Sequence, residues 1–232
     1  MNYHFDLGIL LAGKYHDWLL AGTVTTLKLA GVSLLLALCV GFVITLLRLS
    51  PLKILRGFAL VYVEFIRNTP LLVQIFFWYF GATQILPEAF NQWLYRHDFE
   101  FAAAAIALTL YTAAFMAEDL RSGIRSIPRE QMEAARASGF GYLAAMRHVV
   151  LPQAWRVSVP PLINQTLNLT KNSSLAMAIG VAELTYQARQ IESYTFKSFE
   201  AFAAATAIYL AVSLVITLLA QAYEARVLRA HA

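Results

Sequence analysis

Residues 201–222 form an apolar run without a charged side chain, and this run constrains the fold most. A helix needs about 20 mostly apolar residues to cross a bilayer, and only helices and closed barrels satisfy their backbone hydrogen bonds in lipid. A second run, 23–47, contains Lys28 as its one charged residue. Hydrophobic residues make up 59% of the chain and charged residues 14%, against roughly 45–50% and about 25% in soluble domains. We therefore expect an all-α membrane protein, which excludes a disordered chain, a nucleic-acid-binding domain and a disulfide scaffold.

Five segments have the length and hydropathy of membrane-spanning helices: 23–47, 57–81, 101–120, 158–182 and 201–222. Cytoplasmic loops carry an excess of Lys and Arg, so the loops orient the chain. When the N-terminus is placed outside, the inner segments contain 11 Lys and Arg residues and the outer segments contain 4. We therefore expect a single domain, residues 1–232, with five transmembrane helices, an outer N-terminus and an inner C-terminus. This topology accounts for the pI near 9.2 without a nucleic-acid partner.

The longest predicted loop, residues 121–156, is expected to lie in the cytoplasm and to be folded. Ser126 and Pro128 are typical of a helix start, and Gly139 is typical of the position just after a helix end. A second short helix is expected after Gly139, and it should end near Pro152 because proline disfavours a helix interior. The loop is thus predicted to form a helix-turn-helix hairpin. Its tether between two spans argues against DNA recognition.

The same loop contains a motif with a distinctive spacing. Its residues are Glu133, Ala134, Ala135, Gly139, Leu151 and Pro152, with Val149 and Val150 before the last pair. The spacing resembles the EAA motif of ABC importer permeases, which usually has isoleucine where Val149 stands. The segments 22–27, 64–74 and 151–154 extend the resemblance to the permeases of polar amino-acid uptake. The resemblance implies a type I ABC importer permease fold whose cytoplasmic hairpin couples to an ATPase.

The resemblance also implies partners and a location. The chain would be the transmembrane subunit of an ATP-driven amino-acid importer in the bacterial inner (cytoplasmic) membrane. Its partners would be two copies of an ABC ATPase, a second permease subunit that is either identical or a paralogue, and an extracytoplasmic amino-acid-binding protein. ATP and magnesium would bind to the ATPase, so no cofactor, metal or catalytic residue is expected on this chain. In the hairpin, Glu133 would either pair with a basic group of the ATPase or cap backbone amides.

The fourth predicted span carries large polar side chains at membrane depth, where such groups are costly. At about 100° per residue they fall within an arc of roughly 120° on one helix face. They are Asn164, Gln165, Asn168, Lys171 and Asn172. This stripe predicts a substrate path, and hydrogen bonding between helices is the alternative. For Lys171, substrate contact and a structural or gating role both stay open.

The second predicted span contains a polar interruption. Pro70 lacks a backbone N–H and disfavours helical geometry at Thr69, so a break in the helix is expected. Arg67, Thr69 and Pro70 are therefore candidates for a gate or a substrate-facing site. The alternatives for Arg67 are snorkelling to the membrane interface and an ion pair with Glu64.

The expected substrates are glutamate and aspartate. The segments 76–79, 86–88, 160–161 and 168–173 most resemble permeases for these two amino acids, and Arg67 and Lys171 carry positive charges that would attract them. Glutamine, histidine and arginine are the alternatives.

Glu118 and Asp119 lie at the end of the third predicted span. They are expected to pair with Arg121 or to cap the hairpin. A different class of protein, an ion-gradient carrier, would use them together with Lys171 as coupling groups. Such carriers commonly have repeated halves, so the five predicted spans without a visible repeat argue against this class.

Overall fold

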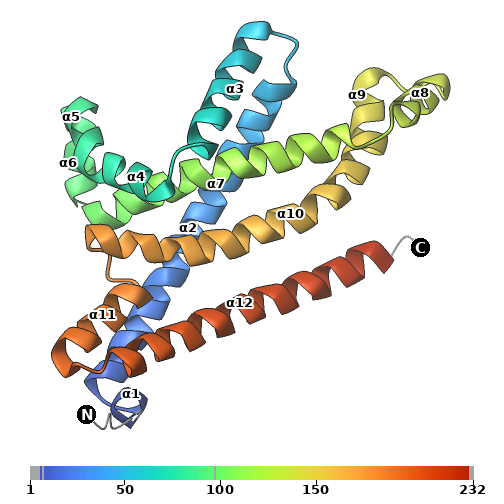
Figure 1. Cartoon of the computed structure of the whole chain (residues 1–232). Helices are drawn as coiled ribbons and strands as arrows, with labels where there is room; N and C mark the ends of the chain where they lie inside the picture. Colours follow the sequence, from blue (N-terminus) through green and yellow to red (C-terminus); the bar gives the residue numbers. More distant parts are fainter. Residues whose placement is uncertain (1–5, 7, 97, 230–232) are drawn as a thin grey trace. The chain divides into compact units, whose positions relative to one another are not determined.

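The computed structural model describes residue 6 and residues 8–96 and 98–229 (Figure 1). Throughout these residues the regular structure is helical, as the sequence predicts. The elements are α1 (Gly8–Leu11), α2 (Lys14–Leu49), α3 (Lys53–Arg67), α4 (Leu71–Phe76), the π-helical η1 (Phe77–Gly81), α5 (Ala82–Ile85), α6 (Glu88–Arg96), α7 (Phe99–Arg125), α8 (Arg129–Ala137), α9 (Tyr142–Ala145), the π-helical η2 (Met146–Val150), α10 (Leu151–Asn172), the 3-10 helix η3 (Ser173–Ile179), α11 (Leu184–Thr195) and α12 (Ser198–Arg229).

Three helices in the described residues are long and apolar enough to cross a membrane: α2, α7 and the Ser198–Ala225 part of α12. A fourth candidate arises if α3 and the segment Leu71–Ile85 count together as one broken span. The predicted spans 23–47, 101–120 and 201–222 fall within the three long helices. The predicted span 158–182 is divided between α10, η3 and the residues that follow, because the α-helix ends at Asn172. The count of five spans and their orientation stay predictions.

The chain divides into two compact units that are interleaved along the sequence. The first unit consists of Met1–Leu35, Pro70–Thr109 and Leu167–Ile216, and the second of Leu36–Thr69, Leu110–Thr166 and Thr217–Ala232. The four long helices α2, α7, α10 and α12 each contribute to both units.

In the first unit, α11 lies against the N-terminal part of α2 and the start of α12 (Figure 1). The buried apolar residues that join these helices and α1 are Leu10, Leu19, Leu184, Ala188, Ile191, Ala201 and Ala205. Gly22 permits the close approach of α2 and α11, since a Cβ there would lie 2.9 Å from the Leu184 Cα. Small residues serve this purpose generally where membrane helices meet.

The N-terminus of α11 is capped by a fully buried carboxylate. Glu183 stands directly before α11 and accepts hydrogen bonds from the backbone N–H groups of Thr185 (3.0 Å) and Tyr186 (2.8 Å). The Thr26 hydroxyl of α2 accepts a hydrogen bond from a third backbone N–H group, that of Leu184, over 3.1 Å. Side chains that flank a helix start satisfy N–H groups that have no partner inside the helix. The start of α11 is therefore fixed by its own cap and by α2.

In the second unit, α2, α3 and α7 pack around the buried residues Ile44, Ala59, Val63 and Ala117. α7 also lies close to α10, and Gly123 makes this approach possible. A Cβ on Gly123 would lie against the Ser158 hydroxyl and 3.1 Å from the Ala154 carbonyl oxygen. The second unit is thus held together by small residues at its helix crossings.

Candidate functional site

The hairpin predicted from the sequence is formed by α8 and α9, which pack against each other in the second unit (Figure 1). α8 contains Glu133, Ala134 and Ala135. Ala135 is buried, whereas Glu133 and Ala134 are exposed. Among the residues that the structure describes, the Glu133 carboxylate makes no hydrogen bond, and α8 has no side-chain cap. The motif therefore turns one small residue inward and presents a carboxylate outward.

Gly139 ends α8 in a left-handed conformation with φ +90°. The N–H of Phe140 donates to the Ala135 carbonyl over 3.2 Å, and the N–H of Gly139 donates to the Arg136 carbonyl over 3.0 Å. These two hydrogen bonds form a Schellman motif, which favours glycine at this position. A Cβ on Gly139 would meet no atom within 4 Å. The backbone conformation, rather than lack of space, therefore requires glycine here.

Three details of the predicted hairpin are wrong. Ser126 does not cap α8: its hydroxyl donates to the Gly123 carbonyl over 2.8 Å, because α7 continues to Arg125 and Ser126 lies just past its end. Pro128 stands immediately before α8 rather than inside its first turn. The second helix does not end near Pro152, because α9 continues through η2 into α10. The widened π-helical turn directly before α10 accommodates the proline ring and its missing N–H.

The hairpin is joined to α10 by hydrogen bonds as well as by the continuous helix. The Gln153 side-chain amide donates to the Val149 carbonyl over 2.9 Å and to the Gln131 side chain of α8 over 3.4 Å. An apolar cavity of about 610 Å³ lies beside this junction, between α2, α7 and the η2–α10 segment. Leu151 of the motif and Trp155 line it. The end of the motif thus contributes an apolar side chain, itself partly exposed, to the wall of this cavity.

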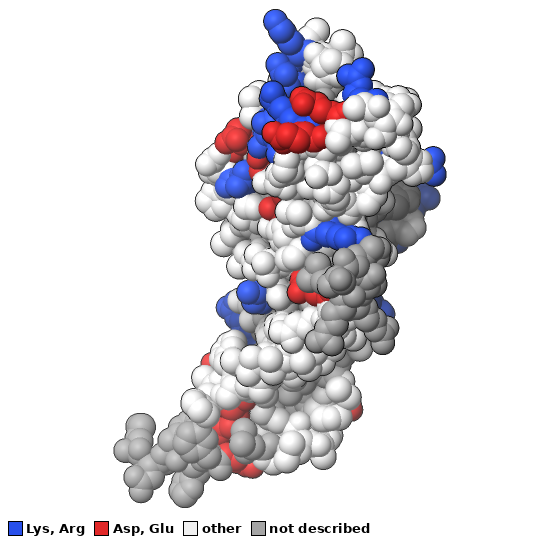
Figure 2. Space-filling view, turned by 90° about the vertical axis from the view of Figure 1, so that its right-hand side faces the viewer, with Lys and Arg blue, Asp and Glu red and all other residues white. Residues whose placement is uncertain are grey.

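The second unit carries most of the positive charge of the chain. Residues 36–69 and 110–166 contain ten Lys and Arg residues and five Asp and Glu residues. Figure 2 shows basic side chains, with a few carboxylates between them, toward the top of its view, the end of the second unit where Figure 1 places α3 and the α8–α9 hairpin. This surface is suited to a partner whose own surface carries negative charge.

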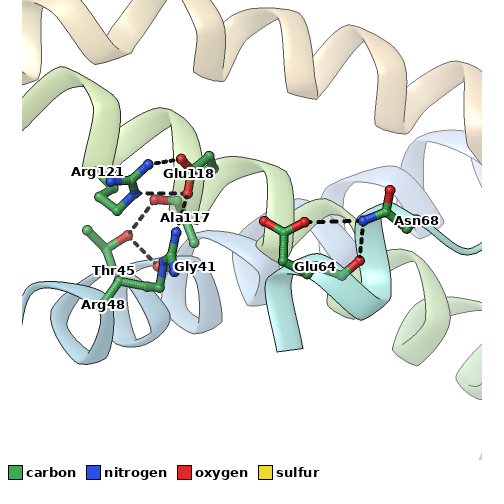
Figure 3. A network of polar contacts seen from close by, with 8 residues as sticks. All are labelled: Gly41, Thr45, Arg48, Glu64, Asn68, Ala117, Glu118 and Arg121. Atoms are coloured by element: carbon green, nitrogen blue, oxygen red, sulfur yellow. Dashed lines mark hydrogen bonds and ion pairs between the residues drawn. The ribbon is translucent and has the colours of Figure 1, made fainter. Parts of the chain in front are cut away.

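A cluster of three charged residues ties α2 to α7 within the second unit (Figure 3). Glu118 accepts hydrogen bonds from the Arg121 Nε over 2.9 Å and from the Arg48 guanidinium over 3.2 Å. The Thr45 hydroxyl of α2 lies beside this cluster. It is within hydrogen-bond distance of the Gly41 carbonyl of its own helix (2.7 Å) and of the Ala117 carbonyl of α7 (3.2 Å). The predicted pairing of Glu118 with Arg121 is confirmed, and Arg48 is a partner that the sequence did not indicate.

The helix break predicted at Pro70 is observed between α3 and α4. Asn68 and Thr69 fill the break and satisfy carbonyl groups at the end of α3. The Asn68 side-chain amide donates to the Glu64 carbonyl over 2.7 Å, and the Thr69 hydroxyl donates to the Phe65 carbonyl over 3.0 Å. Both side chains thus support the end of the helix. A place for Thr69 and Pro70 on the substrate path stays a prediction.

The ion pair considered between Arg67 and Glu64 is wrong. The Glu64 carboxylate accepts from the Asn68 side-chain amide over 3.2 Å (Figure 3). The Arg67 guanidinium instead lies over the ring of Phe115 on α7, with 5.1 Å to the ring centroid. A flat cation over an aromatic face is attracted by the electron-rich ring, so Arg67 is oriented by α7 rather than by its own helix.

The predicted polar stripe lies on α10 and ends with its last residue. Asn164, Asn168 and Lys171 are exposed, and Gln165 and Asn172 are half-buried. The Gln165 side-chain amide of α10 donates to the Asp119 carboxylate of α7 over 2.9 Å, which is one of the interhelical bonds considered as the alternative for the stripe. A role of the polar stripe in lining a substrate path stays a prediction.

Comparison with known proteins identifies the chain. Residues 15–229 match the family described as binding-protein-dependent transport system inner membrane component. The chain belongs to this permease family. The permease is 35% identical over 218 residues to a glutamate/aspartate import permease of Escherichia coli strain K12, a match that covers 92% of this chain and 88% of that protein. It is 40% identical over 209 residues to a probable glutamine ABC transporter permease of Bacillus subtilis strain 168, covering 90% of this chain and 88% of the relative.

A solved structure supports the same conclusion for the fold. The permease superposes on a chain of the crystal structure of an amino acid ABC transporter with histidines, with a TM-score of 0.85 and 33% sequence identity. The match covers 97% of this chain and 100% of that chain. The predicted type I ABC importer permease fold is therefore confirmed.

Family membership also decides between the classes considered from the sequence. The permease is the membrane subunit of an amino-acid ABC importer. It is not an enzyme, since ATP hydrolysis belongs to a separate subunit of such importers. The alternative of an ion-gradient carrier is not supported.

Sequence reasoning missed two features of the permease. One is the buried cap Glu183, whose position just before an apolar periodic segment is the signal that could have revealed it. The other is the contact of Arg67 with Phe115. Phe115 and Asp119 are four residues apart and share one face of α7, but nothing in the sequence links that face to Arg67.

Proposed function

We propose that the permease serves an importer of glutamate and aspartate in the bacterial inner membrane. The observation that carries this proposal is the similarity, over nearly the whole chain, to a permease named for the import of these two amino acids. The positive side chain of Lys171 is exposed on the permease and favours an acidic substrate. Glutamine is the second candidate, because the relative from Bacillus subtilis is named as a probable glutamine permease.

The proposed partners are an ABC ATPase dimer, a second permease subunit and an extracytoplasmic amino-acid-binding protein. The second permease would be an identical copy or a paralogue. The binding protein would deliver the amino acid, and the permease would pass it to the cytoplasm. ATP and magnesium would be bound by the ATPase, and no cofactor is proposed on the permease.

The α8–α9 hairpin is the proposed contact with the ATPase, through Glu133, Ala134, Ala135 and Gly139. The hairpin continues through η2 into α10 without a break, and Leu151 and Pro152 lie at this junction. A displacement of the hairpin would therefore be transmitted directly to α10. The exposed polar residues of the proposed path, Asn164, Asn168 and Lys171, stand on that helix, with Asn172 at its end. Closure of the ATPase on ATP would thus move a wall of the path.

The test is ATP hydrolysis and uptake in proteoliposomes that contain the permease, its co-purifying ATPase and the binding protein. Each amino acid of a panel is supplied in turn. We expect glutamate and aspartate to stimulate hydrolysis and to be taken up. Stimulation by glutamine alone would replace the proposed substrates with the second candidate. If glutamate, aspartate and glutamine all fail to stimulate hydrolysis, both the proposed substrates and the second candidate are overturned.

A further inference from the structure

Two opposite charges lie near each other in the second unit without forming an ion pair. Arg67 is the last residue of α3, and Asp119 lies on α7. The Arg67 guanidinium lies over the ring of Phe115, which stands four residues before Asp119 on the same helix. Among the described residues, the ion pairs do not include one between these two side chains. Both side chains are at least partly exposed, so a ligand can reach them.

Each of the two charges is held by a neighbour. The Arg67 guanidinium lies over the Phe115 ring at 5.1 Å from its centroid. Phe115 is four residues before Asp119, so the ring and the carboxylate share one face of α7. The Asp119 Oδ2 accepts a hydrogen bond from the Gln165 side-chain amide of α10 over 2.9 Å. Three helices, α3, α7 and α10, thus bring a cation and an anion to one place and fix both.

Each charged group also retains hydrogen-bonding capacity. A guanidinium has five N–H donors in a planar fork, and a carboxylate has two oxygens with about four acceptor positions. In the part of the chain that the structure describes, the Arg67 guanidinium contacts the Phe115 ring and its N–H groups donate no hydrogen bond to another residue, so these donors are available to a ligand. Within the described residues, the hydrogen bond from Gln165 is to Oδ2, and Asp119 Oδ1 has no such bond. A ligand with one anionic and one cationic group would satisfy both residues at once.

We propose that Arg67 and Asp119, oriented by Phe115 and Gln165, bind the α-carboxylate and the α-ammonium group of the transported amino acid. Arginine binds carboxylates with two parallel hydrogen bonds, and a carboxylate accepts charge-assisted hydrogen bonds from an ammonium group. This inference rests on the proposed function in one respect, because it requires that the transported substrate is a free α-amino acid. It does not depend on which amino acid this is, because all of them carry the same two groups.

The first test uses the wild-type permease–ATPase complex without the binding protein, so that the amino-acid site of the binding protein does not contribute. Binding of radiolabelled glutamate is measured by equilibrium dialysis. Two competitors are added, glutarate, which lacks the α-amino group, and 4-aminobutyrate, which lacks the α-carboxylate. We expect each to compete at least tenfold less well than glutamate, a difference of about 1.4 kcal/mol. If the importer proves to carry glutamine, the corresponding analogues of glutamine are used.

The second test assigns each group to its residue. Asp119→Asn keeps the size of the side chain and an oxygen for Gln165 but removes the charge. We expect it to weaken glutamate binding at least tenfold while glutarate binds as it does to the wild type. Arg67→Gln should weaken glutamate binding to the same extent and leave 4-aminobutyrate binding unchanged. This crossed pattern distinguishes direct contact from a general structural defect.

The chain offers matched controls for both variants. Glu64→Gln removes an exposed carboxylate three residues before Arg67, and Arg56→Gln removes an exposed guanidinium from the same helix, α3. Both are expected to bind glutamate as the wild type does. Equal losses in control and test variants would overturn the proposal.

The proposal is also overturned if glutarate and 4-aminobutyrate compete as well as glutamate, or if the wild-type complex binds none of them. These measurements need no variant, so a variant that fails to assemble does not leave the proposal untested. The competition measurements also test the inference separately from the proposed identity of the transported amino acid. Import of glutamine alone would contradict the proposed substrates but not the inference, whereas equal competition by the analogues would contradict the inference but not glutamate import.

Discussion

The Tyr209 hydroxyl of α12 donates to the Glu183 carboxylate over 2.6 Å and so joins the buried cap of α11 to the last long helix. A hydrogen bond to a buried charged group contributes about 1.5–3 kcal/mol. Tyr209→Phe is therefore expected to lower the stability of the first unit by about this amount, which a thermal unfolding scan of the purified permease–ATPase complex would measure. Tyr223→Phe changes an exposed tyrosine of the same helix and is expected to leave the Tm unchanged. Equal melting of the two variants would contradict the role of this bond.

The pH dependence of stability offers a second test of the same pair. Burial raises the pKa of the Glu183 carboxyl, although hydrogen bonds from Tyr209 and from two backbone N–H groups oppose the shift. The folded state then holds the proton more tightly than the unfolded state, whose pKa is about 4.3. The contribution of Glu183 to stability therefore falls as the pH rises from about 4.3 through the folded pKa.

Tyr209→Phe removes a donor that favours the ionised form, so the stability deficit of this variant should grow as the pH rises through that window. Glu183→Gln removes the titrating carboxyl. It should therefore flatten the dependence of the Tm on pH, both in the otherwise wild-type permease and in the Tyr209→Phe variant. The measurement is the Tm as a function of pH. A deficit that is the same at all pH values would show that the carboxyl does not titrate as described.

Local signals in the sequence were sufficient for the hairpin and the helix break. Gly139 marks the end of α8 because a left-handed residue there is a backbone requirement, and Pro70 marks the break because its ring and missing N–H act on the nearest residues. Ser126 was misjudged for a local reason too. α7 extends past the predicted end of its span, and a hydroxyl just past a helix end bonds backward to that helix.

Contacts between distant parts of the chain could not be predicted in the same way. The Gln165–Asp119 hydrogen bond and the contact of Arg67 with the Phe115 ring join different helices. Helical periodicity identifies the face of each helix but not which faces meet. Arg67 has Glu64 within reach on its own helix, yet packing against α7 gave it another neighbour.

Gly123 is expected to be irreplaceable at the crossing of α7 and α10. The Cβ of Gly123→Ala would lie 3.1 Å from the Ala154 carbonyl oxygen and against the Ser158 side chain, so the helix backbones must move apart. Such overpacking costs about 1–3 kcal/mol and should lower the Tm. Gly31→Ala is the matched control, because a Cβ at this helical position of α2 meets nothing within 4 Å. It should be neutral or stabilising by about 0.5–1 kcal/mol, and a Tm loss equal to that of Gly123→Ala would contradict the steric explanation.

Gly139 is expected to control the shape of the hairpin. A residue with a Cβ in the left-handed region costs about 1–2 kcal/mol, so Gly139→Ala should loosen the turn and reduce ATP hydrolysis stimulated by substrate and binding protein. Gly139→Asn should have a smaller effect, because asparagine tolerates this conformation better. Gly141→Ala is the control, since Gly141 has φ −66° and open space around it. The hypothesis fails if the Gly141 variant is impaired as much as Gly139→Ala.

The outward carboxylate of Glu133 provides the sharpest test of the proposed ATPase contact. It is exposed on α8 and bonds to no described residue, so replacing it should leave the fold of the permease intact. If it pairs with a basic group of the ATPase, Glu133→Lys sets like charges against each other, and Glu133→Gln merely removes the attraction. We therefore expect Glu133→Lys to lower stimulated ATP hydrolysis by at least tenfold, about 1.4 kcal/mol, and Glu133→Gln to have an intermediate effect.

Glu130→Lys makes the same change of charge one turn earlier on α8, at another exposed position, and should retain most of the stimulated hydrolysis. The amount of ATPase that co-purifies with each variant reports on docking separately from hydrolysis. Normal docking with lost stimulation would mean that Glu133 transmits movement, whereas lost docking would mean that it holds the ATPase in place. Full activity of Glu133→Lys would remove this residue from the interface, because two positive charges in contact would repel each other.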